Sequence, residues 1–301
     1  MEKIIQYIKL IRVKHYIKNL LIFLPLFFSG LYHNMNNIFI CILGFVLFSA
    51  VCSIVYVVND ICDIDKDRKH PKKKTRPLAS GKVSIKEAYG IIAFLILISI
   101  IMSLILLNKQ VSYMAILLTL VYLVLNLLYS KWLKNVVLID VIILVSGFLI
   151  RLFLGSVLID TYVSNYLYLT VISGAFYLGF GKRRNEMIKS DVNTRKVLQY
   201  YNKDFLDKNM YVCLTLTIVF YSMWAVDPTV IDKVHHNILV WTVPLVMIIL
   251  FQYSLIIEKD SFGDPVEVLL HNKTLLATVL IYVLIIFVVW VMSGEKKFIF
   301  E

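Results

Sequence analysis

Five oxygen-bearing side chains lie within nine positions of the sequence, directly after a long uncharged stretch: Asn59, Asp60, Asp63, Asp65 and Asp67. If the helix expected of the uncharged stretch continues for two more turns, Asn59, Asp63 and Asp67 lie above one another on one face. Asp60 then lies at the edge of that face. Proteins usually bind Mg2+ through one or two carboxylates together with phosphate oxygens of a substrate. The spacing therefore predicts a Mg2+ site on Asn59, Asp63 and Asp67 that receives a diphosphate.

A basic segment follows these acidic residues at once. Its side chains could bind the phosphate oxygens that the metal leaves uncovered. Pro71 and Pro77 disfavour helical structure just before them, so we expect a loop that folds back over the acids. An ordinary solvated loop between two membrane helices would show a similar mixture of charges. The basic residues are His70, Lys72, Lys73, Lys74 and Arg76.

The complete string resembles the signature loop of the UbiA-type membrane prenyltransferases. The residues that carry the resemblance are Asn59-Asp60-x-x-Asp63-x-x-x-Asp67-x-x-His70-Pro71-x-Lys73-x-x-Arg76-Pro77-x-x-x-Gly81. The string is most similar to the branch that transfers phosphoribosyl groups to polyprenyl phosphate, the decaprenyl-phosphate phosphoribosyltransferases. The resemblance implies catalytic roles for Asn59, Asp60, Asp63, Asp67, Lys73 and Arg76.

The composition requires a membrane to surround most of the chain. Of the 301 residues, 59% are hydrophobic and only 17% are charged, and several uncharged runs approach the ~20 residues that a spanning helix needs. The net charge of +11 does not indicate nucleic-acid binding, because the basic residues lie in short loops between apolar runs. The four cysteines show neither zinc-ligand nor disulfide spacing.

We expect an all-α membrane protein with nine transmembrane helices and a cytoplasmic N-terminus. The N-terminus and the even-numbered loops hold 26 of the 31 Lys and Arg residues, which places those loops in the cytoplasm and the protein in the cell membrane. A single domain, 1–301, should carry a basic amphipathic surface helix at 1–16 and cytoplasmic loops at 59–87, 129–135, 182–209 and 258–273. The expected spans are 17–32, 38–58, 88–107, 111–128, 136–158, 162–181, 210–226, 238–257 and 274–293.

Two further groups of polar residues lie at the cytoplasmic ends of expected spans. The segment Arg12-x-Lys14-His15-Tyr16-x-Lys18-Asn19 concentrates cations where lipid phosphates lie, so anchoring to anionic lipid and substrate binding are both open on charge alone. Resemblance to the phosphoribosyltransferase branch favours a role for Lys14 and Lys18 in holding the phosphate of the lipid substrate. Tyr129 and Lys134 also resemble a family element, although such residues are common membrane anchors.

The fifth expected span contains two ionisable residues, Asp140 and Arg151. Ionisable groups at this depth usually face the interior of a helical bundle or a wet cavity. Eleven residues make about three turns, so both residues share one face, but they lie ~16 Å apart along the helix and cannot pair with each other. Each needs a partner elsewhere, and a structural ion pair and a substrate-binding role are both open.

The segment after the sixth expected span, Gly181-Lys182-Arg183-Arg184-Asn185-Glu186, resembles a motif of the same branch. Prenyltransferases that use a prenyl diphosphate and an aromatic acceptor carry a second Asp-rich motif here, which this chain lacks. Cations at this place suit a ligand with two phosphate-bearing ends. Lys182 and Arg183 are therefore candidates for the 5-phosphate of a sugar, and Asp140 or Glu186 for its hydroxyls. Gly263-Asp264-Pro265-x-Glu267 is a weaker family element without an assigned role.

The resemblance implies a UbiA-type bundle around a central cavity and a Mg2+-dependent transfer of 5-phosphoribosyl from phosphoribosyl diphosphate to a polyprenyl phosphate. Departure of diphosphate builds negative charge that Mg2+, Lys73 and Arg76 could stabilise. The acceptor phosphate is already an anion, so no general base is needed. A homo-oligomer is left open. One alternative is a prenyltransferase acting on an aromatic or other small acceptor, and another is a lipid or ion transporter using Asp140 and Arg151.

Overall fold

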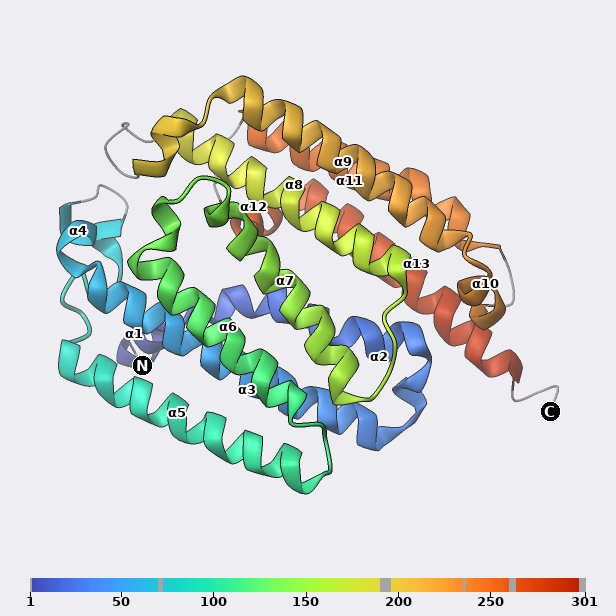
Figure 1. The fold of residues 1–301 in the computed structure, drawn as a ribbon, viewed down its shortest axis with the longest axis horizontal. Coiled ribbons are helices and arrows are strands. Elements are labelled where there is room, and N and C mark those ends of the chain that lie inside the picture. Colours follow the sequence, from blue (N-terminus) through green and yellow to red (C-terminus); the bar gives the residue numbers. More distant parts are fainter. Residues whose placement is uncertain (1, 70–72, 190–195, 235–236, 260–263, 298–301) are drawn as a thin grey trace. The chain divides into compact units, whose positions relative to one another are not determined.

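The computed structural model describes residues 2–69, 73–189, 196–234, 237–259 and 264–297, and every regular element in these ranges is a helix (Figure 1). The chain forms two compact units. The first comprises Met1–Phe27, Leu31–Trp132 and Ile150–Thr161, and the second comprises Phe28–Gly30, Leu133–Leu149 and Tyr162–Glu301. Helix α7 (Ile139–Leu158) contributes residues to both.

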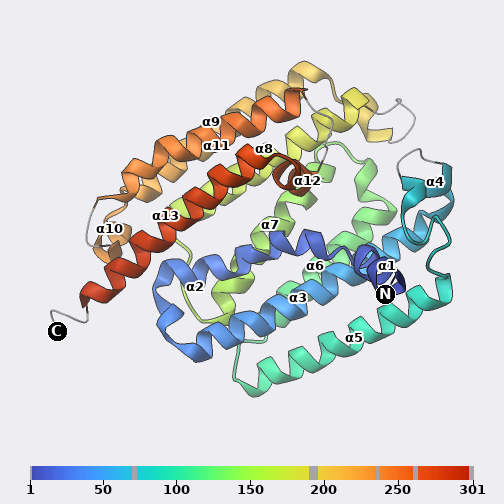
Figure 2. The same ribbon diagram turned by 180° about the vertical axis from the view of Figure 1, so that it is seen from behind.

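The first unit is built around α3, the longest helix of the described chain. Its stretch from Ile40 to Val57 is mostly buried, and it packs against α5, η1 and α6 (Figure 2). Asn34 caps the start of α3, and Ser84 and Glu87 form a capping box at the start of α5. The helices are α1 (Glu2–Leu10), η1 (Val13–Phe23), α2 (Leu24–Ser29), η2 (Leu31–His33), α3 (Met35–Cys62), α4 (Ile64–Lys69), η3 (Lys73–Thr75), α5 (Ile85–Asn108) and α6 (Met114–Lys131).

The second unit contains the long helices α8 and α9, which pack against each other, together with α11 and α13 (Figure 1). Its buried core includes Tyr177, Leu206 and Met210. The helices are η4 (Leu133–Asn135), α8 (Asn165–Lys189), η5 (Lys196–Tyr200), α9 (Lys203–Ala225), α10 (Pro228–Val234), η6 (Leu239–Thr242), α11 (Val243–Lys259), α12 (Pro265–His271) and α13 (Lys273–Lys297).

Six stretches of the described chain are long and apolar enough to cross a membrane, as a multi-pass membrane protein requires. The pair α9 and α10, bent by 56° at a short break, would make a seventh. The apolar side chains of α5 are largely exposed, which suits a helix that faces lipid. The six stretches are Met35–Cys62, Ile85–Asn108, Met114–Lys131, Ile139–Leu158, Leu239–Glu258 and Lys273–Met292.

The N-terminal segment differs from the helices expected from the sequence. The surface helix predicted for residues 1–16 ends at Leu10, because Arg12 adopts the left-handed conformation (φ 56°) and interrupts it. The span predicted for 17–32 begins inside η1, an unusually long 3-10 helix, and continues as the short α2 and η2. No single straight α-helix crosses this part of the described chain.

Candidate active site

The acid cluster forms where α3 gives way to α4. Asp63 is the residue that ends α3, with φ −101° and ψ 9°, so the predicted helix does not continue without a break. The amide of Asp63 nevertheless donates to the carbonyl of Asn59 (2.9 Å), and that of Asp67 donates to the carbonyl of Asp63 (2.8 Å). The helical hydrogen bonds between residues four apart, from Asn59 through Asp63 to Asp67, therefore continue across the break.

Two arginines neutralise the buried carboxylates of this cluster. Asp60 and Asp67 are 4% and 3% exposed. Arg76 Nη1 lies 2.6 Å from Asp67 Oδ2 and 3.1 Å from Asp60 Oδ1, so one guanidinium bridges both acids. Arg12 Nη2 lies 2.6 Å from Asp60 Oδ1, and its guanidinium also covers the ring of Tyr56 at 4.8 Å. Arg76, near the end of the basic segment, therefore reaches back to the acids, as expected of a loop that folds over them.

The oxygen donors of the cluster fit Mg2+ chemistry. Within the described residues, no three His, Cys, Asp or Glu side chains converge on one point. Mg2+ does not require such a cage, because substrate phosphates and waters usually complete its octahedron. Asn59 Oδ1 is buried without a hydrogen-bond partner, so this oxygen fits the role of a metal ligand. Asp63 is partly exposed, 3.8 Å from Lys66 Nζ.

The remaining predicted residues of the first unit are accessible in different degrees. Lys73 in η3 and Lys14 in η1 are exposed, whereas Lys18 is half-buried. Tyr129 is half-buried in the last turn of α6. His70, Pro71 and Lys72 of the motif lie outside the described residues.

A second charged cluster lies in the second unit and combines Asp140 with the segment after the sixth expected span. Arg183 Nε lies 2.5 Å from Asp140 Oδ2, and both side chains are fully buried. Arg183 also pairs with Glu186, whose side chain is 27% exposed. Asp140 thus has the partner on another helix that its depth required. Three of the four residues predicted to bind the sugar phosphate and its hydroxyls therefore lie together. The fourth, Lys182, is half-buried beside them in the chain.

Tyr201 completes this cluster, and sequence reasoning missed it. Its hydroxyl donates to Asp140 Oδ1 (2.7 Å) and accepts from the amide of Leu138 (2.8 Å). Leu138 has φ 65°, an uncommon conformation for a bulky residue, so Tyr201 also supports a constrained turn before α7. Burial and the bond to Asp140 raise the pKa of Tyr201. No local pattern marks a tyrosine that acts at such a distance in the chain.

Other predicted elements lie in this unit as well. Arg184 pairs with Asp207 of α9. Lys134 belongs to η4, which packs against η5 just before Tyr201. Asp264, left without a role by the sequence, caps the start of α12 by accepting from the amide of Val266 (2.9 Å).

Arg151 lies in the first unit and is 5% exposed. Its Nε donates to Asn19 Oδ1 (2.8 Å), and its guanidinium lies over the rings of Phe48 (4.8 Å) and Tyr122 (5.1 Å). The sequence-based prediction that Asp140 and Arg151 have separate partners is therefore confirmed.

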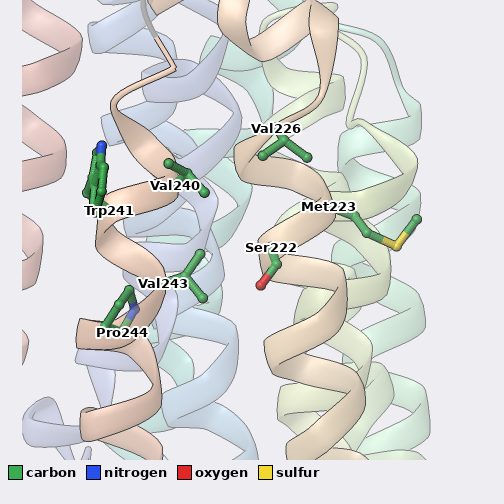
Figure 3. A pocket seen from close by; sticks show the side chains of 7 residues that line it. All are labelled: Ser222, Met223, Val226, Val240, Trp241, Val243 and Pro244. Carbon is green, nitrogen blue, oxygen red and sulfur yellow. The ribbon is translucent and has the colours of Figure 1, made fainter.

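One open apolar pocket of the second unit, about 510 Å³ in volume, is unrelated to either cluster (Figure 3). It lies between the end of α9 and the segment that leads from η6 into α11, and none of the predicted site residues lines it. Its lining residues are Ser222, Met223, Val226, Val240, Trp241, Val243 and Pro244.

Apart from Arg12, the residues of both clusters belong to the part of the chain that a known family matches. The profile of the UbiA prenyltransferase family matches residues 21–272. The chain belongs to the UbiA prenyltransferase family. The resemblance read from the acid cluster is thereby confirmed, and the protein is a UbiA-family transferase.

Similar UbiA-family proteins include enzymes of known name. The decaprenyl-phosphate phosphoribosyltransferase of Mycolicibacterium smegmatis is 29% identical over 281 residues, which cover 89% of this chain and 87% of that protein. The protein of the same name from Corynebacterium glutamicum is 29% identical over 295 residues, covering 95% and 87%. A UbiA homologue from Archaeoglobus fulgidus, solved with GPP and Mg2+, shares the fold with a TM-score of 0.65 at 16% identity, over 96% of this chain and 99% of that chain.

Proposed function

We propose that this UbiA-family transferase moves a 5-phosphoribosyl group from phosphoribosyl diphosphate to a polyprenyl phosphate and releases diphosphate. The observation that carries the proposal is that the chain has two charged clusters, one built on Asp60, Asp67 and Arg76 and the other on Asp140, Arg183 and Glu186. The names of the two bacterial relatives support the same reaction.

The diphosphate end of the donor is assigned to the first cluster. Asn59, Asp63 and Asp67 would hold Mg2+, which would offset the charge of the leaving diphosphate. Arg76 now bridges Asp60 and Asp67, and a cation bound there would free its guanidinium to contact phosphate oxygens. Lys73 is exposed and supplies a second positive group. The carboxylates also tolerate the positive charge that develops on the sugar carbon.

The sugar phosphate end is assigned to the second cluster. Arg183 commits Nε and Nη1 to Asp140 and Glu186, so its main contribution is to fix the position of Glu186. Lys182 and Glu186 are the accessible members of this segment. We therefore assign Lys182, with Arg183 behind it, to the 5-phosphate, and Glu186 or Asp140 to the ribose hydroxyls.

The acceptor is assigned to the N-terminal segment. Lys14 and Lys18 would hold the lipid phosphate, while Tyr129 and Lys134 would contribute at the same membrane face. We further propose nine spans with these residues on the cytoplasmic side, because Lys and Arg are concentrated in the loops that carry them. The nucleophile is an anion throughout, so the protein has only to orient it.

The choice of donor separates this proposal from the aromatic prenyltransferase. Binding of phosphoribosyl diphosphate and of geranyl diphosphate to the purified protein should be measured by titration calorimetry in the presence of Mg2+. The proposal predicts that the sugar donor binds at least tenfold more tightly, because a prenyl diphosphate has no charge at its far end. Equal binding, or tighter binding of geranyl diphosphate, would favour the aromatic prenyltransferase.

A further inference from the structure

The segment that carries Lys14 and Lys18 has an uncommon backbone. Eleven residues, Val13–Phe23, form a 3-10 helix, although such helices rarely exceed four residues. In an α-helix, Lys14 and Lys18 would be neighbours on one face. With three residues per turn, they instead occupy different rows. The 3-10 winding of η1 therefore decides where the two ammonium groups lie. Contacts with the rest of the first unit must maintain this winding.

One row of η1 is held by the interior of the first unit. Tyr16, Asn19 and Ile22 recur every third residue. The hydroxyls of Tyr16 and Ser53 are 2.7 Å apart, and Ser53 in turn donates to the carbonyl of Ile11 (3.0 Å). Ile22 is fully buried. Three residues that a 3-10 helix stacks on one side thus contact the interior of the first unit, and Phe23, which follows Ile22 in the chain, packs against the same core.

Asn19 is the centre of this row. It is 1% exposed, and its Nδ2 donates to Ser49 Oγ (2.8 Å) while its Oδ1 accepts from Arg151 Nε (2.8 Å). Both the nitrogen and the oxygen of the amide are hydrogen-bonded, so the side chain has one orientation. The neighbouring residue in the chain is Lys18.

Helix α7 holds the end of η1 at close range as well. A Cβ added to Gly155 would lie 2.0 Å from the carbonyl oxygen of Ile22, so the backbone of η1 lies directly against this glycine. Arg151 is one turn earlier on α7. Arg151 therefore contacts η1 at Asn19, and Gly155 contacts it three residues later, at Ile22.

We propose that Arg151 is a positioning residue for the lipid substrate. By fixing Asn19, it maintains the 3-10 winding that places Lys14 and Lys18, and so it sets the affinity for the phosphate of a polyprenyl phosphate. This inference rests on the proposed function, which assigns the lipid phosphate to these two lysines. It gives the buried arginine of the fifth expected span a role in acceptor binding without contact with either substrate.

The test compares the dissociation constants of the full-length protein in detergent for decaprenyl phosphate and for phosphoribosyl diphosphate with Mg2+. Arg151→Met should weaken decaprenyl phosphate binding tenfold or more and change donor binding less than twofold. Asn19→Ala should do the same, and the double variant should be no weaker than Arg151→Met alone, because both residues act on one contact. Thr119→Val is the matched control, since Thr119 is 3% exposed and bonds only within its own helix in the contacts described, to Ala115.

Binding of the two ligands distinguishes a failure of the positioning role from a failure of the proposed function. If Arg151→Met does not fold, Asn19→Ala carries the test, because it leaves Arg151 against Phe48 and Tyr122. Unchanged binding of decaprenyl phosphate, or equal weakening of both ligands, would overturn the positioning role. A wild-type protein that binds the donor but not decaprenyl phosphate would overturn the proposed acceptor, and this inference with it.

Discussion

Arg183 Nε lies 2.5 Å from Asp140 Oδ2, and neither side chain is exposed to solvent. Removing one partner of such a pair leaves an uncompensated buried charge, which usually costs about 3–5 kcal/mol. We expect Arg183→Ala to lower the free energy of unfolding by that amount, measured by denaturant titration in detergent. Arg183→Ala combined with Asp140→Ala should cost less than the sum of the single changes. Wild-type stability in Arg183→Ala would contradict the structural importance of the pair.

Lys182 provides the cleaner test of donor binding, because it is half-buried and its loss leaves the Arg183 pair intact. A hydrogen bond to a charged group contributes about 1.5–3 kcal/mol, so Lys182→Ala should weaken phosphoribosyl diphosphate binding roughly tenfold or more. Diphosphate lacks the sugar phosphate, and its affinity should change far less. Lys203→Ala, an exposed lysine at the start of α9, is the control. Equal weakening of both ligands would assign Lys182 to the leaving group.

Tyr201 should stabilise the second cluster in a pH-dependent way. Tyr201→Phe removes the bond to Asp140 and the acceptor of the Leu138 amide, at an expected cost of about 1.5–3 kcal/mol. Because the folded-state pKa of Tyr201 is raised, this stability is fully present below the unfolded-state pKa of about 10 and is lost as pH rises toward the folded-state value. Wild type and Tyr201→Phe should therefore converge in alkaline solution. The exposed neighbour provides a control, Tyr200→Phe, and a constant difference at all pH values would refute the assignment.

How much of these clusters could be predicted from the sequence depends on how far apart in the chain the contacting residues lie. That Asn59, Asp63 and Asp67 are related by a helical turn could be predicted from their spacing, because the hydrogen bonds between residues four apart continue from α3 into α4. The burial of Asp60 could not be predicted, since its partner Arg12 is distant in the chain and lies at a left-handed position between α1 and η1. Sequence-based propensities do not predict a left-handed backbone conformation at an arginine.

The polar residues inside the spans show the same division. A charge in an apolar run predicts that a partner exists, because an unpaired charge there is expensive. It does not say which distant residue serves, so Arg183 and Tyr201 as partners of Asp140, and Asn19 as a partner of Arg151, required the structure. The 3-10 winding of η1 was hidden for a similar reason. It is maintained by α3 and α7 rather than by its own sequence.

The metal assignment can be tested within a single segment. Asp63→Asn and Asp67→Asn keep the side-chain shape but remove a negative charge, so each should abolish most of the turnover and weaken Mn2+ binding, read by electron paramagnetic resonance, at least tenfold. Asp65→Asn is the control, because the Asp65 side chain is 85% exposed and Asp65 is not among the proposed Mg2+ ligands. Full activity in chelator, or in Asp63→Asn, would exclude the proposed Mg2+ site.

The central claim is the transfer of phosphoribosyl to a lipid phosphate. Purified protein should be incubated with Mg2+, phosphoribosyl diphosphate radiolabelled in the sugar, and decaprenyl phosphate, and the lipid extract and released diphosphate should be quantified together. The account predicts a labelled lipid that retains the sugar phosphate, formed in equal amount with diphosphate and only when all three components are present. Diphosphate release without a labelled lipid, or a prenylated product from geranyl diphosphate and an aromatic acceptor under the same conditions, would contradict it.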